Sequence, residues 1–323
     1  MNCDVAILGG GMVGLCLAYQ LLERKEASKI VIIEKEKALG LHSSGRNSGV
    51  LHAGLYYKPD SLKAKVCVSG AKRLREWIEE RRLPINICGK VIVPQDLELD
   101  NQLDELYKRG INNGASVEIW DEKQLKDFVP EAYTSSGRAL WSPNTSVVKP
   151  KEVLKQLSNE LMQRGVKILT SQKGWNVSLK EKQLQLSKGE NINYAHLINA
   201  TGLFADRVAH EFGVGEEFSL LPFKGLYWSI KKDCPIKLKT NVYPVPDLNV
   251  PFLGVHFTPS ADEDPIVNIG PTATPAFGRE NYRAFDELEP LSAFSNLFLL
   301  ANQYINNSGG FRRYVHEQSP LCL

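Results

Sequence analysis

A glycine-rich turn close to the start of the chain has the spacing of a dinucleotide-binding motif. Gly9, Gly11 and Gly14 form a GxGxxG pattern between an apolar, strand-like run and a helical pattern. In such a turn the first glycine permits a tight bend, the second lets the backbone approach a pyrophosphate, and the third lets helix and strand pack closely. The N–H groups at the start of the helix, at Met12 and Val13, would donate hydrogen bonds to the phosphates. The turn therefore predicts a site for a dinucleotide cofactor.

The residue that ends the second strand-like run is acidic. Glu34 lies 20 residues after Gly14, where a carboxylate accepts hydrogen bonds from the ribose hydroxyls of a dinucleotide. An acidic side chain at this place disfavours the 2′-phosphate of NADP. We group Lys35, the next residue, with Glu34 as a cofactor-binding residue. The pattern therefore predicts NAD or FAD rather than NADP.

A second turn made of small residues follows the strand-like run that ends at Asn199. Ala200, Thr201 and Gly202 come next, and a helical pattern containing Asp206 begins just after them. Small residues at such a turn let the backbone pass close to a bound cofactor, although a strand–turn–helix connection needs small residues in any case. Because this turn accompanies the first motif in one chain, we favour FAD over NAD.

The elements expected around these motifs follow the order of an α/β protein. Strands are predicted at 4–8 and 29–33 with a helix at 12–25 between them, which is the opening of a doubly wound sheet. A polar, glycine-rich stretch at 40–54 has no periodicity and is interpreted as a functional loop. Further helices are expected at 61–82, 99–109, 150–164 and 311–316, and further strands at 90–93, 166–169, 195–199, 225–230, 252–257 and 266–269.

Length and composition narrow the class of protein further. The chain has 323 residues, which suits two domains, and its 43% hydrophobic and 24% charged residues are typical of a globular protein with a sizeable core. A net charge of +2 gives no electrostatic footprint for nucleic acid. The six cysteines show no CxxC pattern, so we expect neither a metal site nor a disulfide framework. No apolar run reaches the ~18 residues of a spanning helix, and we expect a cytoplasmic protein or one peripheral to a membrane.

The glycine motifs, Glu34 and the Ala-Asp-Arg segment at 205–207 together resemble the D-amino-acid-oxidase-like superfamily of FAD-dependent oxidoreductases. Within it, HSSGRNSGVLHAGLYY at 42–57 and its continuation KPDSLKA at 58–64 closely resemble the L-2-hydroxyglutarate dehydrogenase/oxidase family. Three later stretches resemble the same family: LPFKGLY at 221–227, YPVP at 243–246 and PFLGVHFT at 251–258. The resemblance runs from residue 2 to roughly residue 315.

This resemblance implies a two-domain flavoprotein of the α/β class. We expect a doubly wound, Rossmann-like FAD-binding domain from residues 1–82 and 141–215. A substrate domain with a mixed β-sheet plus helices would come from residues 83–140 and 216–323. Family members continue past the position matched by Leu323 with a strand and a helix that return to the cofactor domain, so we expect that segment to be missing here.

The reaction implied by the resemblance is the FAD-dependent oxidation of L-2-hydroxyglutarate, a dicarboxylate, to 2-oxoglutarate by hydride transfer. Oxygen or a membrane quinone would then reoxidise the flavin. Two alternatives stay open. One is a related flavin oxidoreductase that acts on an amino acid or on glycerol 3-phosphate, and the other is a non-catalytic, truncated remnant.

The oxidation of a 2-hydroxy acid needs a base for the hydroxyl proton and cations or donors for the carboxylates. A neutral histidine suits the first task, and we expect His256 or His52 to perform it. His256 has the alternative role of a structural histidine in a sheet, and His52 that of a fixed donor packed against the flavin. Lys224 is the expected charge partner of a carboxylate, unless it faces solvent.

Two tyrosines and the glycine-rich loop complete the expected site. Tyr57 and Tyr243 are expected to donate hydrogen bonds to a substrate carboxylate, although buried core tyrosines are at least as common. His42 is interpreted as a loop residue near the phosphates rather than a base, and Arg46 as a partner of the pyrophosphate or the flavin. The remaining loop residues assigned to the cofactor are Ser43, Ser44, Asn47 and Ser48.

Overall fold

The computed structural model describes residues 1–187, 189–231, 233–246, 254–283 and 286–318. The chain divides into two compact units, and each is assembled from two separate segments. Unit 1 consists of 1–47 and 150–222, and unit 2 of 48–149 and 223–323. These units differ from the expected domains, since 48–82 and 141–149 belong to unit 2, and the domain limits at 82, 141 and 215 stay a prediction.

Unit 1 is built on a six-stranded sheet with a parallel core. In spatial order its strands are β10 (Trp175–Ser178), β11 (Gln183–Leu186), β12 (Asn191–Asn199), β1 (Asn2–Leu8), β2 (Ile30–Ile33) and β9 (Lys167–Leu169). β1 and β2 are nearly continuous apolar runs, because strands in the middle of a parallel sheet are covered on both faces. This sheet confirms the predicted Rossmann-like fold.

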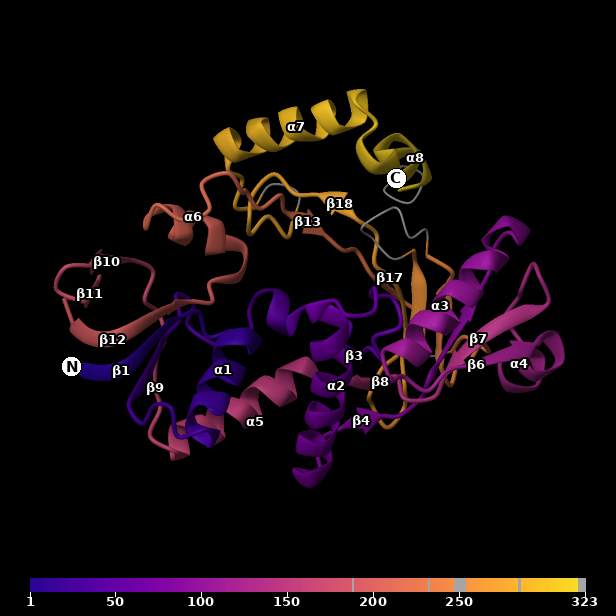
Figure 1. Ribbon diagram of the computed structural model, residues 1–323, viewed down its shortest axis with the longest axis horizontal. Coiled ribbons are helices and arrows are strands. Elements are labelled where there is room, and N and C mark those ends of the chain that lie inside the picture. Colours follow the sequence, from indigo (N-terminus) through magenta and orange to yellow (C-terminus); the bar gives the residue numbers. More distant parts are fainter. Residues whose placement is uncertain (188, 232, 247–253, 284–285, 319–323) are drawn as a thin grey trace. The chain divides into compact units, whose positions relative to one another are not determined.

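The helices of unit 1 precede or follow its parallel strands in the chain. They are α1 (Met12–Glu23), α5 (Pro150–Gln163), α6 (Ala205–His210) and the 3-10 helices η1 (Ser43–Gly45) and η3 (Gly202–Phe204). α1 and α5 lie side by side against the sheet (Figure 1). Pro150 starts α5 as expected, since the ring of proline presets the helical φ angle. Gly165 follows the end of α5 with a φ of +89°, which favours glycine.

Unit 2 is built on a seven-stranded mixed sheet. In spatial order its strands are β14 (Trp228–Ser229), β17 (Val267–Gly270), β16 (His256–Pro259), β15 (Asn241–Pro244), β5 (Lys90–Val93), β7 (Arg138–Ser142) and β6 (Glu118–Asp121). β15 and β5 are parallel and the other pairs are antiparallel. Two small sheets accompany it, formed by β3 (Val50–Leu51), β8 (Ser146–Val148) and β4 (Ile85–Asn86), and by β13 (Phe223–Lys224) and β18 (Thr274–Pro275).

The helices of unit 2 are α2 (Leu62–Glu80), α3 (Asp100–Asn112), α4 (Glu122–Phe128), α7 (Pro290–Ile305), α8 (Phe311–Gln318) and the 3-10 helices η2 (Leu97–Leu99) and η4 (Ser308–Gly310). A buried core forms where Leu103 and Leu106 of α3 pack on Ile92 and Leu140 of the sheet. Tyr243 of β15 belongs to the same core. Within the part of the chain that the structure describes, no helix is long and apolar enough to cross a membrane.

Two expected strands of unit 2 differ from the observed ones. The strand expected at 225–230 is reduced to Trp228–Ser229, which pairs with Ile269 and Asn268 of β17. The strand expected at 252–257 begins only at His256, and its residues 252–253 lie outside the described residues. The loop expected at 40–54 is interrupted by η1 and by β3.

Candidate functional site

The GxGxxG turn of unit 1 needs glycine for reasons that are visible in the structure. Gly9 has a φ of +109°, and a Cβ atom there would stand 2.2 Å from the carbonyl oxygen of Ala200. A Cβ atom on Gly14 would stand 2.1 Å from the carbonyl oxygen of Gly9. The backbone N–H of Ala200 donates to Leu8 O at 2.8 Å, so the two small-residue turns lie against each other. Side chains larger than hydrogen would push this double turn apart.

The start of α1 presents backbone donors. Gly11 is the N-cap residue and, as a glycine, has no side chain to cap the helix. The Met12 N–H donates to Ser44 Oγ at 2.9 Å, whereas the first-turn N–H groups of a helix have no acceptor within the helix itself. Val13 is 71% exposed, so this end of the helix is open. The arrangement provides donors and a positive dipole end for an anion.

The carboxylate of Glu34 is held in a fixed position at the end of β2. It is buried, and its two oxygens accept hydrogen bonds from the backbone N–H groups of Gly10 and Glu36, both at 2.9 Å. Each carboxylate oxygen keeps a second acceptor site, which a ribose hydroxyl can use. Lys35 pairs with Glu36 at 3.5 Å, and its Nζ lies 4.5 Å from the centroid of the Phe204 ring.

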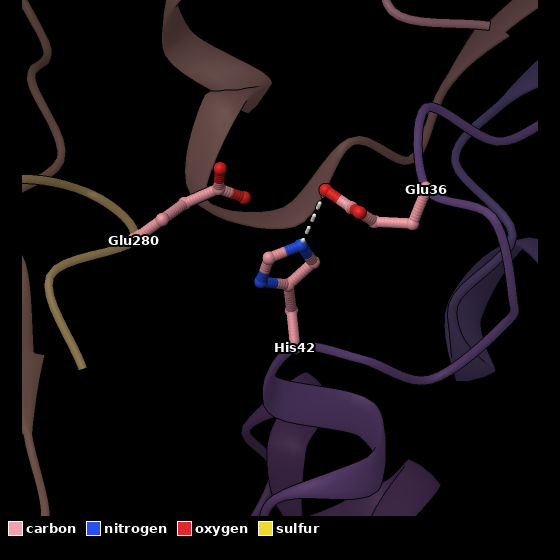
Figure 2. A group of neighbouring side chains, drawn as sticks. All are labelled: Glu36, His42 and Glu280. Carbon is pink, nitrogen blue, oxygen red and sulfur yellow. Dashed lines mark hydrogen bonds and ion pairs between the residues drawn. The ribbon is translucent and has the colours of Figure 1, made fainter. Parts of the chain in front are cut away.

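The loop that follows β2 is ordered by its own hydrogen bonds. His42 Nε2 lies 3.2 Å from Glu36 Oε1, and Figure 2 shows the imidazole ring turned toward this carboxylate. Arg46 Nε donates to Leu41 O at 2.6 Å. Asn47 Nδ2 donates to two carbonyl oxygens at 3.0 Å each, those of Ser43 and Ser44. The loop therefore keeps Ser44 in place beside Met12.

The second small-residue turn is also held by polar contacts. Thr201 Oγ1 donates to Asn199 Oδ1 at 2.7 Å, and Gly202 has a φ of +60°. Asp206 accepts from the backbone N–H of Leu220 at 2.9 Å and from that of Arg207 at 2.8 Å. This pair of bonds gives Asp206 a structural task in the turn of unit 1.

The residues of unit 1 fit a dinucleotide. Backbone donors at an open helix start, glycines where a Cβ atom would collide with neighbouring backbone, and an acidic residue at the end of β2 are the three parts that such a cofactor requires. Ser44 Oγ stands beside these donors.

A cavity of about 330 Å³ lies in unit 2 and brings several of the expected residues together. The expected residues in its lining are Ser48, His52, Lys224, Tyr243 and His256. Tyr57 does not line this cavity, and its carbonyl oxygen instead accepts from Asn113 Nδ2 at 3.0 Å. The volume suits a small ligand with a few polar groups.

His256 has a defined tautomer within this cavity. His256 is 4% exposed, and its Nδ1 lies 2.9 Å from the carbonyl oxygen of Gly254. A carbonyl oxygen only accepts, so Nδ1 carries the hydrogen and the neutral ring leaves Nε2 as a free acceptor. Burial, helped by the charge of Lys90, lowers the pKa of His256 to about 4 against the opposing effect of the Gly254 bond. The ring stacks on Tyr243 with centroids 3.8 Å apart.

His52 is the second neutral histidine of the cavity. Burial, together with the charges of Lys90 and His256, lowers the pKa of His52 to about 3. Its ring meets the Tyr243 ring edge-on at a centroid distance of 6.3 Å. Nδ1 of His52 has no hydrogen-bond partner among the described residues. Burial also raises the pKa of Tyr243, so its phenol keeps its proton.

Lys224 is positioned by an asparagine that the sequence did not single out. Its Nζ donates to Asn281 Oδ1 at 3.2 Å. Asn281 is 2% exposed, and its Nδ2 donates to the carbonyl oxygens of Arg283 at 2.6 Å and Asp286 at 2.7 Å. The amide therefore holds the lysine at the cavity. An isolated asparagine in a polar stretch carries no sequence signal for such a role.

Two further residues of this region were missed. Lys90 was predicted only as the first residue of a strand, yet it is fully buried near the histidines. The available signal was a charged residue at the head of the apolar run KVIV. Tyr227 lines the cavity and hydrogen-bonds with Ser48, while burial raises the pKa of Tyr227.

Comparisons with solved structures identify the fold. L-alpha-glycerophosphate oxidase from Mycoplasma pneumoniae, solved with FAD bound, matches with a TM-score of 0.75 at 24% identity over 92% of this chain and 78% of its own. Glycine oxidase from Geobacillus kaustophilus matches with a TM-score of 0.70 at 20% identity over 94% of this chain and 77% of its own. The chain therefore shares the fold of these two oxidases.

Sequence comparisons identify the family. The model of the "FAD dependent oxidoreductase" family matches residues 4–311. The mitochondrial L-2-hydroxyglutarate dehydrogenase of Caenorhabditis briggsae is 40% identical over 90% of this chain and 69% of its own length, and that of Homo sapiens is 35% identical over 99% and 71%. The chain thus belongs to the FAD dependent oxidoreductase family, in the group of the L-2-hydroxyglutarate dehydrogenases, and its cofactor is FAD.

Proposed function

We propose that this protein oxidises L-2-hydroxyglutarate to 2-oxoglutarate with FAD as the hydride acceptor. The observation that carries the proposal is the cavity of unit 2, where His256 with a free Nε2 and Lys224 stand in one lining. A base and a cation are what the oxidation of a hydroxy acid requires. The two relatives above are named for this substrate.

Unit 1 would hold the cofactor. The N–H groups at the start of α1 would bind the pyrophosphate, and Glu34 would bind the ribose. The residues that we assign to FAD binding are Gly9, Gly11, Met12, Val13, Gly14, Glu34, Lys35, Ser43, Ser44, Arg46, Asn47, Ala200, Thr201, Gly202 and Asp206. Ser48 was expected in this set, and its place in the cavity of unit 2 favours a role beside the substrate.

The chemistry that bound FAD supplies is acceptance of the hydride that leaves C2 of the substrate. His256 Nε2 takes the hydroxyl proton as the C–O bond becomes a carbonyl, so one hydride and one proton leave together. The bond from Nδ1 to Gly254 O keeps the ring oriented for this transfer. A bound dianion raises the pKa of the histidine from about 4, which strengthens it as a base.

The remaining polar groups of the cavity bind and orient the substrate. Lys224 neutralises one carboxylate, and the protonated Tyr243 hydroxyl donates to a carboxylate oxygen. His52, which stays neutral, is a fixed donor or acceptor rather than a charge partner. Tyr57 retains its predicted substrate contact only as a hypothesis, since the cavity of unit 2 does not include it.

The electron acceptor and the compartment stay predictions. We propose that oxygen or a membrane quinone reoxidises the flavin, as in other flavoproteins that oxidise small acids. The sequence predicts a cytoplasmic or membrane-peripheral location, whereas the names of the two relatives place those proteins in mitochondria.

The proposal is tested by anaerobic reduction of the purified, FAD-loaded protein. L-2-hydroxyglutarate should bleach the flavin band near ~450 nm, and the D-enantiomer should not. Glycerol 3-phosphate, glycine and L-proline are tested as alternative substrates, since solved structures with this fold are named for these compounds. If one of these compounds bleaches the flavin and L-2-hydroxyglutarate does not, that compound replaces L-2-hydroxyglutarate as the proposed substrate. If none of the compounds bleaches the flavin, the result favours the non-catalytic remnant.

A further inference from the structure

Lys90 is a fully buried lysine in the core of unit 2. It begins β5, where its neighbours in register are Asn241 of β15 and Ser142 of β7. Its residue is 0% exposed, and among the residues that the structure describes Nζ has no hydrogen-bond partner. No carboxylate is among the groups that act on its charge. Because an unpaired ammonium is costly to bury, a functional counter-charge is the natural explanation.

The ammonium group lies between two aromatic rings next to the cavity. Nζ is 4.5 Å from the centroid of the Tyr56 ring and 4.8 Å from that of Tyr243, distances at which ring faces stabilise a cation. Tyr243 lines the cavity, whereas Lys90 does not. The charge is therefore one side chain away from the cavity, and the buried rings between them screen it far less than water would.

We infer that Lys90 is a specificity-determining residue that supplies the second positive charge for a dicarboxylate bound in the cavity of unit 2. Lys224, held by Asn281, supplies the first charge in the lining itself. The inference rests on the proposed function, and it gives the buried ammonium the counter-charge that the described residues do not provide. A dianion gains more from this potential than a monoanion does, so Lys90 favours dicarboxylates over monocarboxylates.

The charge state of Lys90 gives the inference a pH signature. Burial lowers the pKa of Lys90 to about 7, opposed by nearby Cys67. The titratable groups around it are Cys67, His52, Tyr56, Tyr243 and His256. Without ligand the two histidines have pKa values of about 3 and about 4, so they are neutral in this range, and Lys90→Met separates any uptake by them from uptake by the lysine. A dianionic ligand raises the pKa of Lys90, so its binding between roughly pH 7 and pH 9 takes up a proton.

Calorimetry of the FAD-loaded protein tests this. The ligands are 2-oxoglutarate and 2-oxopentanoate, which replaces the distal carboxylate by a methyl group, in two buffers of different ionisation enthalpy at about pH 8. Wild-type protein should take up a fraction of a proton with 2-oxoglutarate. Lys90→Met should abolish this proton uptake. It should lower the affinity for 2-oxoglutarate on the order of tenfold and lower the affinity for 2-oxopentanoate less. Ser142→Ala, which alters a buried neighbour of Lys90 in register without changing charge, should behave as wild type.

Folded Lys90→Met protein with unchanged proton uptake and unchanged ligand preference would overturn the inference. If this variant does not fold, the wild-type protein alone decides, because binding without proton uptake between roughly pH 7 and pH 9 would show that Lys90 is not the charge partner. Failure of wild-type protein to bind 2-oxoglutarate is a different result. It would overturn the proposed function, and the inference with it.

Discussion

The candidate sites of the two units consist of different chemical groups, backbone in one and side chains in the other. The proposed cofactor site of unit 1 consists mainly of backbone, since glycines and an open helix start provide the donors and Glu34 adds one carboxylate. Unit 2 makes its cavity from side chains, with two neutral histidines in the lining and Lys90 behind it. The backbone site depends on the absence of side chains, whereas the cavity depends on their identity and charge. Substitutions should therefore act through sterics in unit 1 and through electrostatics in unit 2.

The largest effect is expected for Gly9→Ala. The new methyl group would collide with Ala200 O at a backbone conformation that disfavours alanine, so FAD affinity should fall by about 10³-fold or more. Flavin absorbance retained after gel filtration measures this. Gly70→Ala is the matched control, because Gly70 lies inside α2 with nothing within 4 Å of a new Cβ. Full FAD retention by Gly9→Ala would mean that the turn does not set the cofactor site.

The next effect concerns His256, the proposed base. His256→Ala should keep FAD bound while anaerobic flavin reduction by substrate slows by ~10²-fold or more, because the acceptor for the hydroxyl proton is lost. Stopped-flow absorbance measures the rate. The same substitution at His196, which lies on β12 of unit 1, should leave the rate unchanged. Equal reduction rates for His256→Ala and wild type would remove the histidine from the reaction.

A third prediction concerns pH. The folded protein keeps His52 and His256 neutral, with pKa values of about 3 and about 4, while an unfolded histidine titrates near its ordinary value of 6.5. The unfolded state therefore binds more protons as pH falls below that value, and the folded state loses stability. We expect a loss of about 4 kcal/mol between roughly pH 7 and pH 5, about 2 kcal/mol from each histidine. Hydrogen exchange resolved by peptide should show it in unit 2, and His52→Gln with His256→Gln should flatten it. An equal loss in peptides of unit 1 would contradict the contrast between the units.

A smaller effect is expected for Lys224→Met. Loss of the cation that Asn281 holds should raise KM for L-2-hydroxyglutarate on the order of tenfold and change kcat little, since the carboxylate contact exists before and during the reaction. Steady-state kinetics separates the two constants. Lys231→Met serves as a surface control, because residue 231 is exposed. A fall in kcat at constant KM would assign Lys224 to the chemical step instead.

The smallest effect is expected for Ser44→Ala. Among the residues that the structure describes, the hydroxyl accepts a backbone bond from Met12, so its loss should weaken FAD binding a few-fold, or about 1 kcal/mol. Fluorescence titration of the apoprotein with FAD measures the change. A loss as large as that of Gly9→Ala would show that side chains, and not backbone alone, build the site in unit 1.

The same contrast explains how much could be predicted from the sequence. The GxGxxG turn and Glu34 are local patterns with a fixed spacing along the chain, and the structure places them together at the end of β1 and β2. His256, Lys224 and Tyr243 were named as candidates, and the cavity unites them, but their functional roles remain predictions. Lys90 and Asn281 were missed, because a buried lysine and a buried amide acquire meaning only from tertiary neighbours. Short strands such as β15 and β7 were not predicted for a related reason, since their pairing partners lie far away in sequence.

The pairing of β1 with β12 has a consequence for how the protein is made. Asn2 pairs with Asn193 and Leu8 with Asn199, so β1 cannot pair with β12 until nearly two hundred further residues have been synthesised. At about 10 residues per second this delay is roughly 20 s. During this time the apolar strands at the start of the chain expose unpaired edges, which are prone to aggregation. Synthesis of this flavoprotein should therefore depend on chaperones that bind the nascent chain, more than that of a protein whose neighbouring strands are consecutive in sequence.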